Sequence, residues 1–188
     1  MVKAIIFDCF GVLATEAWLP FKAKYFGHDP ELFKKASEIG HQADKGSISY
    51  DDCMKAIAKL AGITPEQAVE AIAHNVPDEE LFAYVRELKK DYKLGLLSNV
   101  AGNYLHQIFT TSQLSLFDAI ALSFESGFIK PQAEAFGVMA KQLGVDLNEC
   151  VFIDDQQRNV NGAITAGMPA IVYHDAAKLQ RELSKLLS

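Results

Sequence analysis

Short, uninterrupted apolar runs recur along the chain and predict buried strands. The runs cover residues 2–7, 93–97, 119–122, 150–153 and 170–173. They are rich in Ile, Val, Leu and Phe and do not alternate with polar residues, which is typical of strands covered on both faces. The pattern therefore predicts a parallel sheet with helices on both sides.

Between the later runs, apolar residues recur at helical spacing. The stripes are Phe136, Met139, Ala140 and Leu143; Val160, Ala163, Ile164 and Gly167; and Leu179, Leu183 and Leu186. Strands that alternate with such helices predict right-handed crossover connections. The expected fold class is α/β, with a Rossmann-like parallel sheet at its core.

The segment 15–77 interrupts this rhythm, because it contains no convincing strand and reads as helical. Residues suited to start helices recur in it, with proline at the first helical position after two of them: Asp29, Ser49 and Thr64. We therefore expect a core domain formed by residues 1–14 and 78–188. An all-helical cap of residues 15–77 would be inserted into it.

Composition narrows the classes of function. The 188 residues are 49% hydrophobic, which is enough for a sizeable core, and 18 basic against 24 acidic residues give a net charge of −6. This charge argues against a nucleic acid or an anionic membrane as partner. No apolar run is long enough to span a bilayer. With no signal-peptide pattern and three unpaired cysteines, we expect a cytoplasmic protein with reduced thiols.

Chemically active side chains follow four of the predicted strands. The segments are Asp8-Cys9-Phe10-Gly11, Ser98-Asn99, Lys130-Pro131 and Asp154-Asp155. In an open parallel sheet, ligands bind at the carboxyl ends of the strands. We therefore expect these segments, although far apart in the sequence, to form one site.

The charges of this predicted site favour a metal ion. Asp8, Asp154 and Asp155 would place three carboxylates against the single ammonium of Lys130, and a hard divalent cation such as Mg²⁺ would compensate them. Lys130 would keep Asp8 ionised and balance a bound anion. Ser98 and nearby backbone N–H groups are donors for phosphate oxygens. An ionised Asp8 could then act as a nucleophile and form an aspartyl-phosphate.

The order F-D-x-x-G-V-L, L-L-S-N, K-P and F-I-D-D resembles the haloacid dehalogenase-like hydrolase superfamily. The resemblance covers essentially the whole chain, and the helical insert is similar to the small cap of the first subgroup. It implies that Asp8 is the nucleophile and Lys130 the catalytic cation. Ser98, with Asn99 and Gly11, would bind the substrate.

The same resemblance implies how Mg²⁺ would be held. Asp8, Asp155 and the backbone carbonyl of Phe10 are the expected ligands, together with Asp154, and the choice between the two neighbouring aspartates for direct contact stays open.

Two positions depart from the family pattern. Phosphatases of the superfamily usually have a second Asp at the position of Phe10, where it protonates the leaving group. Its loss is expected to weaken activity and to make the rate depend steeply on the leaving group, since general acid catalysis contributes roughly 100- to 10,000-fold. Asn159 stands where many relatives have Asp, and it is expected to orient Lys130 or Asp155.

Three functions remain open at this point. The leading one is a Mg²⁺-dependent hydrolase of small phosphorylated metabolites. Phe10 keeps open a catalytically feeble binding or regulatory protein that retains the site. It also keeps open a metal-free 2-haloacid dehalogenase, although the acidic pair and the lack of any arginine before Arg86 argue against that enzyme. The individual substrate and the oligomeric state are not determined.

Overall fold

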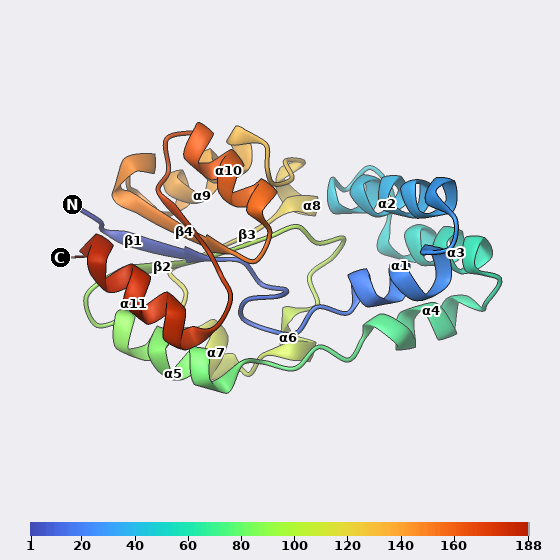
Figure 1. Cartoon of the computed structure of the whole chain (residues 1–188), viewed down its shortest axis with the longest axis horizontal. Helices are drawn as coiled ribbons and strands as arrows, with labels where there is room; N and C mark the ends of the chain where they lie inside the picture. The colour runs from blue at the N-terminus through green and yellow to red at the C-terminus, as the bar shows by residue number, and fades with distance from the viewer. Residues whose placement is uncertain (188) are drawn as a thin grey trace.

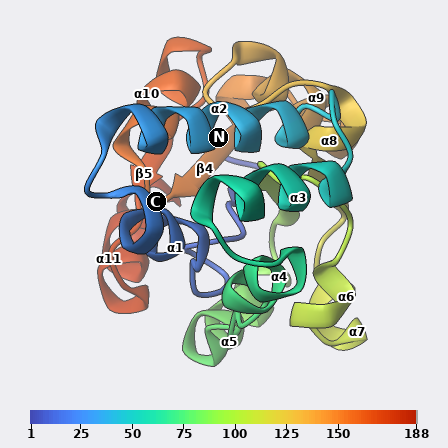
Figure 2. The ribbon, with the colours of Figure 1, turned by 90° about the vertical axis from the view of Figure 1, so that its right-hand side faces the viewer.

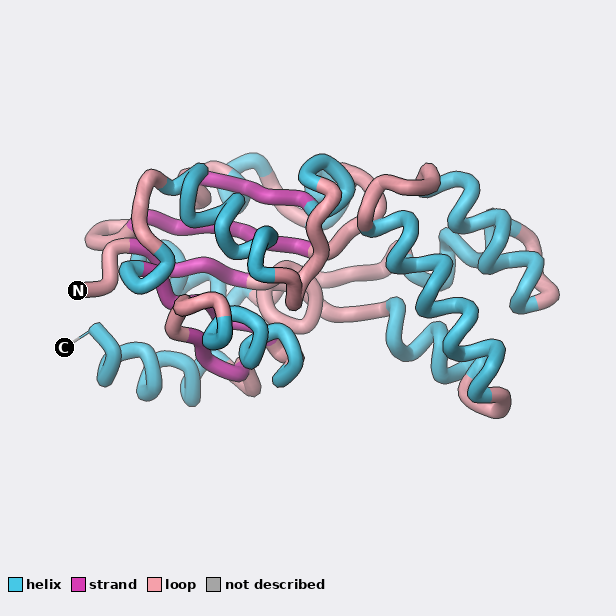
Figure 3. Tube along the Cα trace, turned by 90° about the horizontal axis from the view of Figure 1, so that it is seen from above, coloured by secondary structure: helices cyan, strands magenta, loops and turns pink. Residues whose placement is uncertain are grey.

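A five-stranded parallel sheet forms the centre of the computed structural model, which describes residues 1–187 (Figures 1 and 3). Its strands are β1 (Ala4–Phe7), β2 (Lys93–Ser98), β3 (Ala119–Leu122), β4 (Cys150–Asp154) and β5 (Ala170–Val172). All pairs are parallel, in the order β3-β2-β1-β4-β5. The predicted parallel sheet is confirmed, and each strand lies within two residues of its predicted bounds.

Helices cover both faces of the sheet. Figure 1 shows α5 (Glu79–Leu88) and α11 (Ala176–Leu187) on one side, and α9 (Ala133–Leu143) and α10 (Gln157–Thr165) on the other. Successive strand side chains point to opposite faces. Ile5 therefore joins the apolar cluster under α5 and α11, whereas Ile6 joins the cluster under α9 and α10. This double burial explains the uninterrupted apolar runs.

The first helical stripe is buried throughout, and the other two are correct except at Ile164, Gly167 and Leu186. Ile164 is 55% exposed and Leu186 is 46% exposed. Both lie in the last turn of their helices, α10 and α11. Short helices that no periodicity revealed complete the core: α6 (Leu105–Ile108), α7 (Thr111–Leu114), α8 (Ser123–Ser126) and the 3-10 helix Leu147–Glu149. Within residues 1–187, no helix combines the length and apolar character needed to cross a membrane.

The inserted segment folds into four helices with an apolar cluster of their own. They are α1 (Trp18–Phe26), α2 (Pro30–Asp44), α3 (Tyr50–Ala61) and α4 (Pro65–Ile72), and Figure 2 shows α2 and α3 packed side by side. The predicted N-caps are confirmed. Asp29 accepts from Glu31 N–H, Ser49 accepts from Asp52 N–H, and Thr64 forms a capping box.

Two loop segments connect the cap helices to the sheet and pair with each other (Figure 3). Ala14 and Pro77 form an antiparallel bridge, and Thr15 N–H donates to the Val76 carbonyl at 2.9 Å. The cap also contacts the core away from these loops, where the Tyr50 and Tyr104 rings lie 5.6 Å apart. The division of the chain into domains at these loops stays a prediction.

Candidate active site

The strand ends bring three carboxylates together. Asp8 follows β1 directly, Asp154 ends the neighbouring strand β4, and Phe7 pairs with Ile153 in register, so the two aspartates lie at the same level. Asp155 is the next residue. Ligand oxygens of Asp8, Asp154 and Asp155 all lie within 4.8 Å of one another. The convergence follows from parallel strands that end at one edge of the sheet.

Lys130 is buried between two of these carboxylates. Its Nζ lies 2.6 Å from Asp8 Oδ1 and 2.8 Å from Asp154 Oδ2, and it sits over the Phe152 ring at 5.2 Å. The ammonium is 1% exposed. Burial opposes its charge, but the carboxylates outweigh burial and raise the pKa of Lys130. Lys130 is therefore a fixed positive charge at the edge of the sheet.

Asp154 is the carboxylate that Lys130 holds ionised. Asp154 also accepts from Gln156 N–H at 2.8 Å and from Asn159 Nδ2 at 3.0 Å. Burial opposes its ionisation, yet Lys130 and these hydrogen bonds lower the pKa of Asp154. Asn159 thus orients Asp154, which corrects the expectation that it would orient Lys130 or Asp155. Asp154 is not one of the two partners that the sequence led us to expect for Asn159.

Asp8 is more weakly compensated. Besides Lys130, the only group that donates to its Oδ1 within residues 1–187 is the Cys9 N–H, at 2.6 Å. Burial raises the pKa of Asp8 well above its usual range, although Lys130 opposes this. The contact with Lys130 is the one expected from the sequence. The same ammonium also contacts Asp154, so the two carboxylates share its charge.

Asp155 offers an oxygen without a partner. Its Oδ1 is buried and makes no hydrogen bond in the described part of the chain. Burial and the neighbouring Asp154 raise the pKa of Asp155 to about 6. An unpaired carboxylate oxygen beside two further carboxylates is the donor set that a hard cation takes. The residues therefore fit Mg²⁺, with Asp155 better suited to direct contact than Asp154, whose oxygens are engaged.

Gly11 brings the loop after β1 against this carboxylate. Its φ is +81°, and a Cβ at this position would lie 2.6 Å from Asp155 Oδ2. Any other residue would strain the backbone and displace Asp155. Gly11 thus shapes the carboxylate cluster, while its predicted contact with substrate stays a prediction.

Ser98 and Asn99, at the end of β2, have different surroundings. Ser98 is fully buried, and its hydroxyl has no nitrogen or oxygen partner among residues 1–187, although it lies within interaction range of the Cys9 thiol. Asn99 accepts from Lys130 N–H at 2.8 Å and donates to the Lys130 carbonyl at 3.1 Å. The Ser98 hydroxyl is thus free to bind an anion, whereas the Asn99 amide positions Lys130. Sequence patterns carry no signal for this contact between two loops.

The residues after Asp8 contribute no proton donor. Phe10 is partly buried and packs against the apolar cluster under α5 and α11. Cys9 is buried, and burial raises the pKa of its thiol far above neutral. Another carboxyl, Asp44 at the end of α2, feels the charge of Lys130 from the cap side. No sequence motif marks Asp44.

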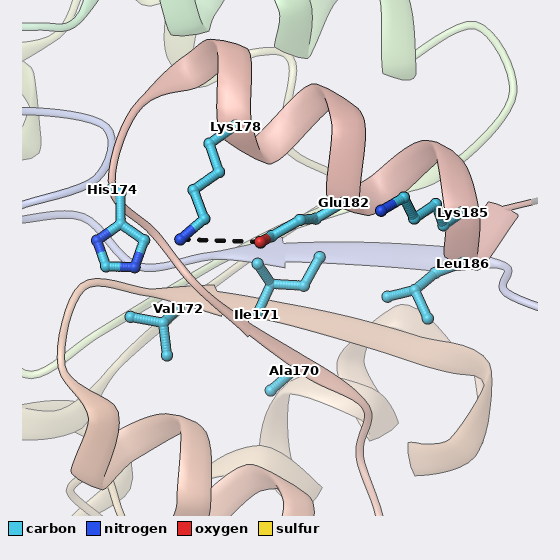
Figure 4. Close-up of a pocket in the computed structure, with 8 residues that line it drawn as sticks. All are labelled: Ala170, Ile171, Val172, His174, Lys178, Glu182, Lys185 and Leu186. Carbon is cyan, nitrogen blue, oxygen red and sulfur yellow. Dashed lines mark ion pairs between the residues drawn. The ribbon is translucent and has the colours of Figure 1, made fainter.

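The surface depression in Figure 4 lies away from these residues, between β5 and α11. The Lys178 and Glu182 side chains, one turn apart on α11, form an ion pair of 3.8 Å along one wall of it. It is lined by Ala170, Ile171, Val172, His174, Lys178, Glu182, Lys185 and Leu186. None of them was predicted to take part in the chemistry, and the depression adds nothing to the site.

Comparisons with known proteins show what the whole chain is similar to. The model of the haloacid dehalogenase-like hydrolase family matches residues 2–167. A sesquiterpene phosphatase of Aspergillus oryzae is 28% identical over 197 residues, which cover 98% of this chain and 96% of the relative. The D-ribitol-5-phosphate phosphatase of Bacteroides thetaiotaomicron is 28% identical over 207 residues, the full length of both chains.

Solved structures share the fold. A magnesium complex of a HAD family enzyme from Bacteroides thetaiotaomicron has a TM-score of 0.78 at 24% identity, over 96% of this chain and 98% of that one. An L-2-haloacid dehalogenase of Xanthobacter autotrophicus has a TM-score of 0.70 at 21% identity, over 98% and 83%. Both phosphatases and dehalogenases thus use similar chains, and the fold alone does not separate the two activities.

Proposed function

The chain belongs to the haloacid dehalogenase-like hydrolase family, and from this premise we propose that it hydrolyses small phosphate monoesters with the help of Mg²⁺. The observation that carries the proposal is the position of Asp8. Its carboxylate lies against Lys130, within 4.8 Å of ligand oxygens of Asp154 and Asp155. This arrangement supports roles for Asp8 as the nucleophile, Lys130 as the cation and the three carboxylates as metal ligands.

Asp8 would attack phosphorus with one carboxylate oxygen and form an aspartyl-phosphate, releasing the alcohol. The buried hydroxyl of Ser98 would donate to a phosphoryl oxygen, and Lys130 would balance the charge that develops there. Water would then attack the same phosphorus and free Asp8. Asp8, Asp155 and the Phe10 carbonyl would hold Mg²⁺, which neutralises charge on the phosphoryl oxygens when bound.

The proposed substrate class rests on what the relatives have in common. A sesquiterpene phosphatase and a ribitol-5-phosphate phosphatase differ in the organic part of their named substrates and share the phosphate. A small phosphorylated metabolite is therefore the expected partner. The net charge of −6 argues against a nucleic acid, which is itself negatively charged, as the substrate.

The dehalogenase reading is the weaker one on this geometry. A metal-free reaction has no use for a cluster of three carboxylates, two of them buried, and here that cluster includes the nucleophile. Phe10 supports a different second candidate, a protein that binds phosphate at this site without useful turnover. Its apolar ring cannot protonate a leaving group.

One panel separates these functions. Phosphate esters and 2-haloacids are incubated with Mg²⁺ or with chelator, using the parent protein and Asp8→Asn. We expect phosphate release that requires both Mg²⁺ and Asp8. Halide release that persists in chelator would establish the dehalogenase. Binding of inorganic phosphate without release from any ester would establish the binding protein.

A further inference from the structure

The proposed hydrolysis leaves one proton unaccounted for. When the phosphorus–oxygen bond breaks, the departing oxygen needs a proton, and Phe10 cannot supply it. Nor can Cys9, whose buried thiol holds its proton too tightly to exchange it near neutral pH. The donor must therefore come from another element that reaches the site.

The cap offers a carboxyl at its border with the core. Asp44 is the last residue of α2, which ends beside α8 (Figure 1). Two residues later the chain passes so close to the core that a Cβ on Gly46 would lie 2.5 Å from the Phe124 carbonyl oxygen. Asp44 is thus held where the end of α2 meets the core, next to the helix that follows β3.

Charged groups from both the core and the cap act on the carboxyl of Asp44. The charges of Lys130 in the core, Lys22 in α1 and Arg158 in α10 all act on its carboxyl. Cys53 of α3 and Tyr104, just before α6, also interact with it electrostatically. Lys130 is the ammonium that contacts Asp8, so Asp44 lies within electrostatic reach of the reacting group.

The carboxyl of Asp44 is also not used elsewhere. In the described part of the chain it makes no hydrogen bond and no ion pair within 4 Å. The partly buried Glu16, in contrast, accepts from Trp18 N–H and Leu19 N–H at the start of α1. Of these two acids near the site, only Asp44 keeps its oxygens free for a ligand.

Its protonation state suits proton transfer. Burial raises the pKa of Asp44 from 3.8 to about 7, against the opposing charges of Lys130, Lys22 and Arg158. A carboxyl with this pKa carries a proton in about half of the molecules at neutral pH, and such a group is both a competent acid and a competent base.

We propose that Asp44 supplies the proton that Phe10 cannot, a proposal that rests on the proposed function. As an oxygen of Asp8 bonds to phosphorus, the phosphorus–oxygen bond to the alcohol breaks and the Asp44 proton moves to the departing oxygen. Water then attacks the aspartyl-phosphate and passes a proton to the Asp44 carboxylate. Inorganic phosphate leaves, and both aspartates return to their starting states.

This proposal changes the leaving-group dependence expected from Phe10 alone. With Asp44 as donor, the parent protein should hydrolyse simple alkyl phosphates and aryl phosphates with similar kcat/KM. In Asp44→Asn, we expect kcat/KM to fall by roughly 100-fold or more for alkyl phosphates and only slightly for p-nitrophenyl phosphate. The loss of rate on the alkaline side of the pH profile, where the donor is ionised, should disappear.

Matched variants assign the effect. Asp51→Asn makes the same change at an exposed position of α3 and should leave both substrates and the pH profile unchanged. Phe10→Asp in the Asp44→Asn background should restore alkyl phosphate hydrolysis. An equal loss on both substrates, or an unchanged alkaline limb in Asp44→Asn, would overturn the proposal. If no substrate is hydrolysed in an Asp8-dependent way, the proposed function fails as well.

The metal-free protein provides a readout that does not depend on activity. Because the pKa of Asp44 is higher in the folded than in the unfolded chain, its ionisation favours unfolding. Asp44→Asn should therefore gain thermal stability over the parent as pH rises from about 4 to about 7, and keep that gain above 7. A difference in Tm that is constant over this range means a normally ionised carboxyl, and would overturn the proposal.

Discussion

Ser98 places a hydroxyl in the interior of the protein, where only the weakly bonding Cys9 thiol, and no nitrogen or oxygen atom of the described residues, is within its reach. A buried polar group left unpaired costs about 1–3 kcal/mol of stability. A role in ligand binding explains why the protein has such a group, because the ligand supplies the missing hydrogen-bond partner. The same reasoning applies to the buried Oδ1 of Asp155.

Replacing Ser98 should therefore separate stability from activity. We expect Ser98→Ala to have an equal or higher Tm and a kcat/KM for phosphate esters that is lower by roughly 10-fold or more, the loss of one hydrogen bond to a charged group. Thermal melts and initial rates measure both. Ser123→Ala is the control, because the buried Ser123 hydroxyl accepts from Val100 N–H at 2.9 Å and its removal should lower Tm. A similar fall in Tm for Ser98→Ala would show that this hydroxyl serves the fold.

At the scale of elements, the loop after β1 determines how closely the backbone approaches the carboxylates. Gly11 has a positive φ and almost touches Asp155, whereas Gly62, at the end of α3, has a φ of +68° and nothing within 4 Å of its Cβ position. The two glycines share the backbone conformation and differ in their surroundings. A pair of alanine variants can therefore separate backbone strain from displacement of Asp155.

In both alanine variants, the positive φ should lower the free energy of unfolding by about 1–2 kcal/mol. Only Gly11→Ala should also lose the stabilisation of the protein by Mg²⁺, since its Cβ would push Asp155 aside. Denaturant melts with and without Mg²⁺ give both quantities. If Gly11→Ala responded to Mg²⁺ as the parent does, Asp155 would not be held by this loop.

Across the whole molecule, the carboxylate cluster ties metal binding to folding. Strands β1 and β4 bring Asp8, Asp154 and Asp155 together only in the folded chain. A metal that binds the folded state alone stabilises it, by about 2.7 kcal/mol at 100 times its Kd. Addition of Mg²⁺ should therefore raise Tm, and removal by chelator should reverse the rise.

Neighbouring aspartates should respond differently to this test. Asp155→Asn should keep its own stability and lose the response to Mg²⁺. Asp154→Asn should lower Tm without any metal, because Lys130 then loses the carboxylate that it holds ionised at 2.8 Å; breaking a buried ion pair costs about 3–5 kcal/mol. A full Mg²⁺ response in Asp155→Asn would exclude this residue as a ligand.

The cap and the sheet are joined by loops that pair with each other at Ala14 and Pro77. We expect the cap of residues 15–77 to move on this paired hinge and to exclude water from the aspartyl-phosphate. Val76 N–H donates to the Thr15 hydroxyl at 2.8 Å, and Thr15 N–H donates to the Val76 carbonyl at 2.9 Å. Hydrogen exchange of these two amides should slow when a phosphate analogue binds with Mg²⁺. Unchanged exchange in both loops and in the cap would contradict a lid.

The sequence by itself determined the features that depend on local pattern. Uninterrupted apolar runs mark strands buried on both faces, and Asp29, Ser49 and Thr64 mark helix starts because each bonds to backbone only two or three residues away. Asp8, Ser98 and Asp154 could be placed in one site because parallel strands end at one edge. That inference needs only the strand ends and the direction of the chain.

The tertiary structure decided what depends on contacts between distant loops and helices. That Lys130 is shared by Asp8 and Asp154, that Asn99 clamps Lys130, and that Asn159 serves Asp154 follow from how loops fold over the sheet edge. Asp44 comes within electrostatic reach of Lys130 only because α2 ends against α8. Periodicity within an element reports which of its faces is buried, but it carries no information about which side chain from another element lies opposite.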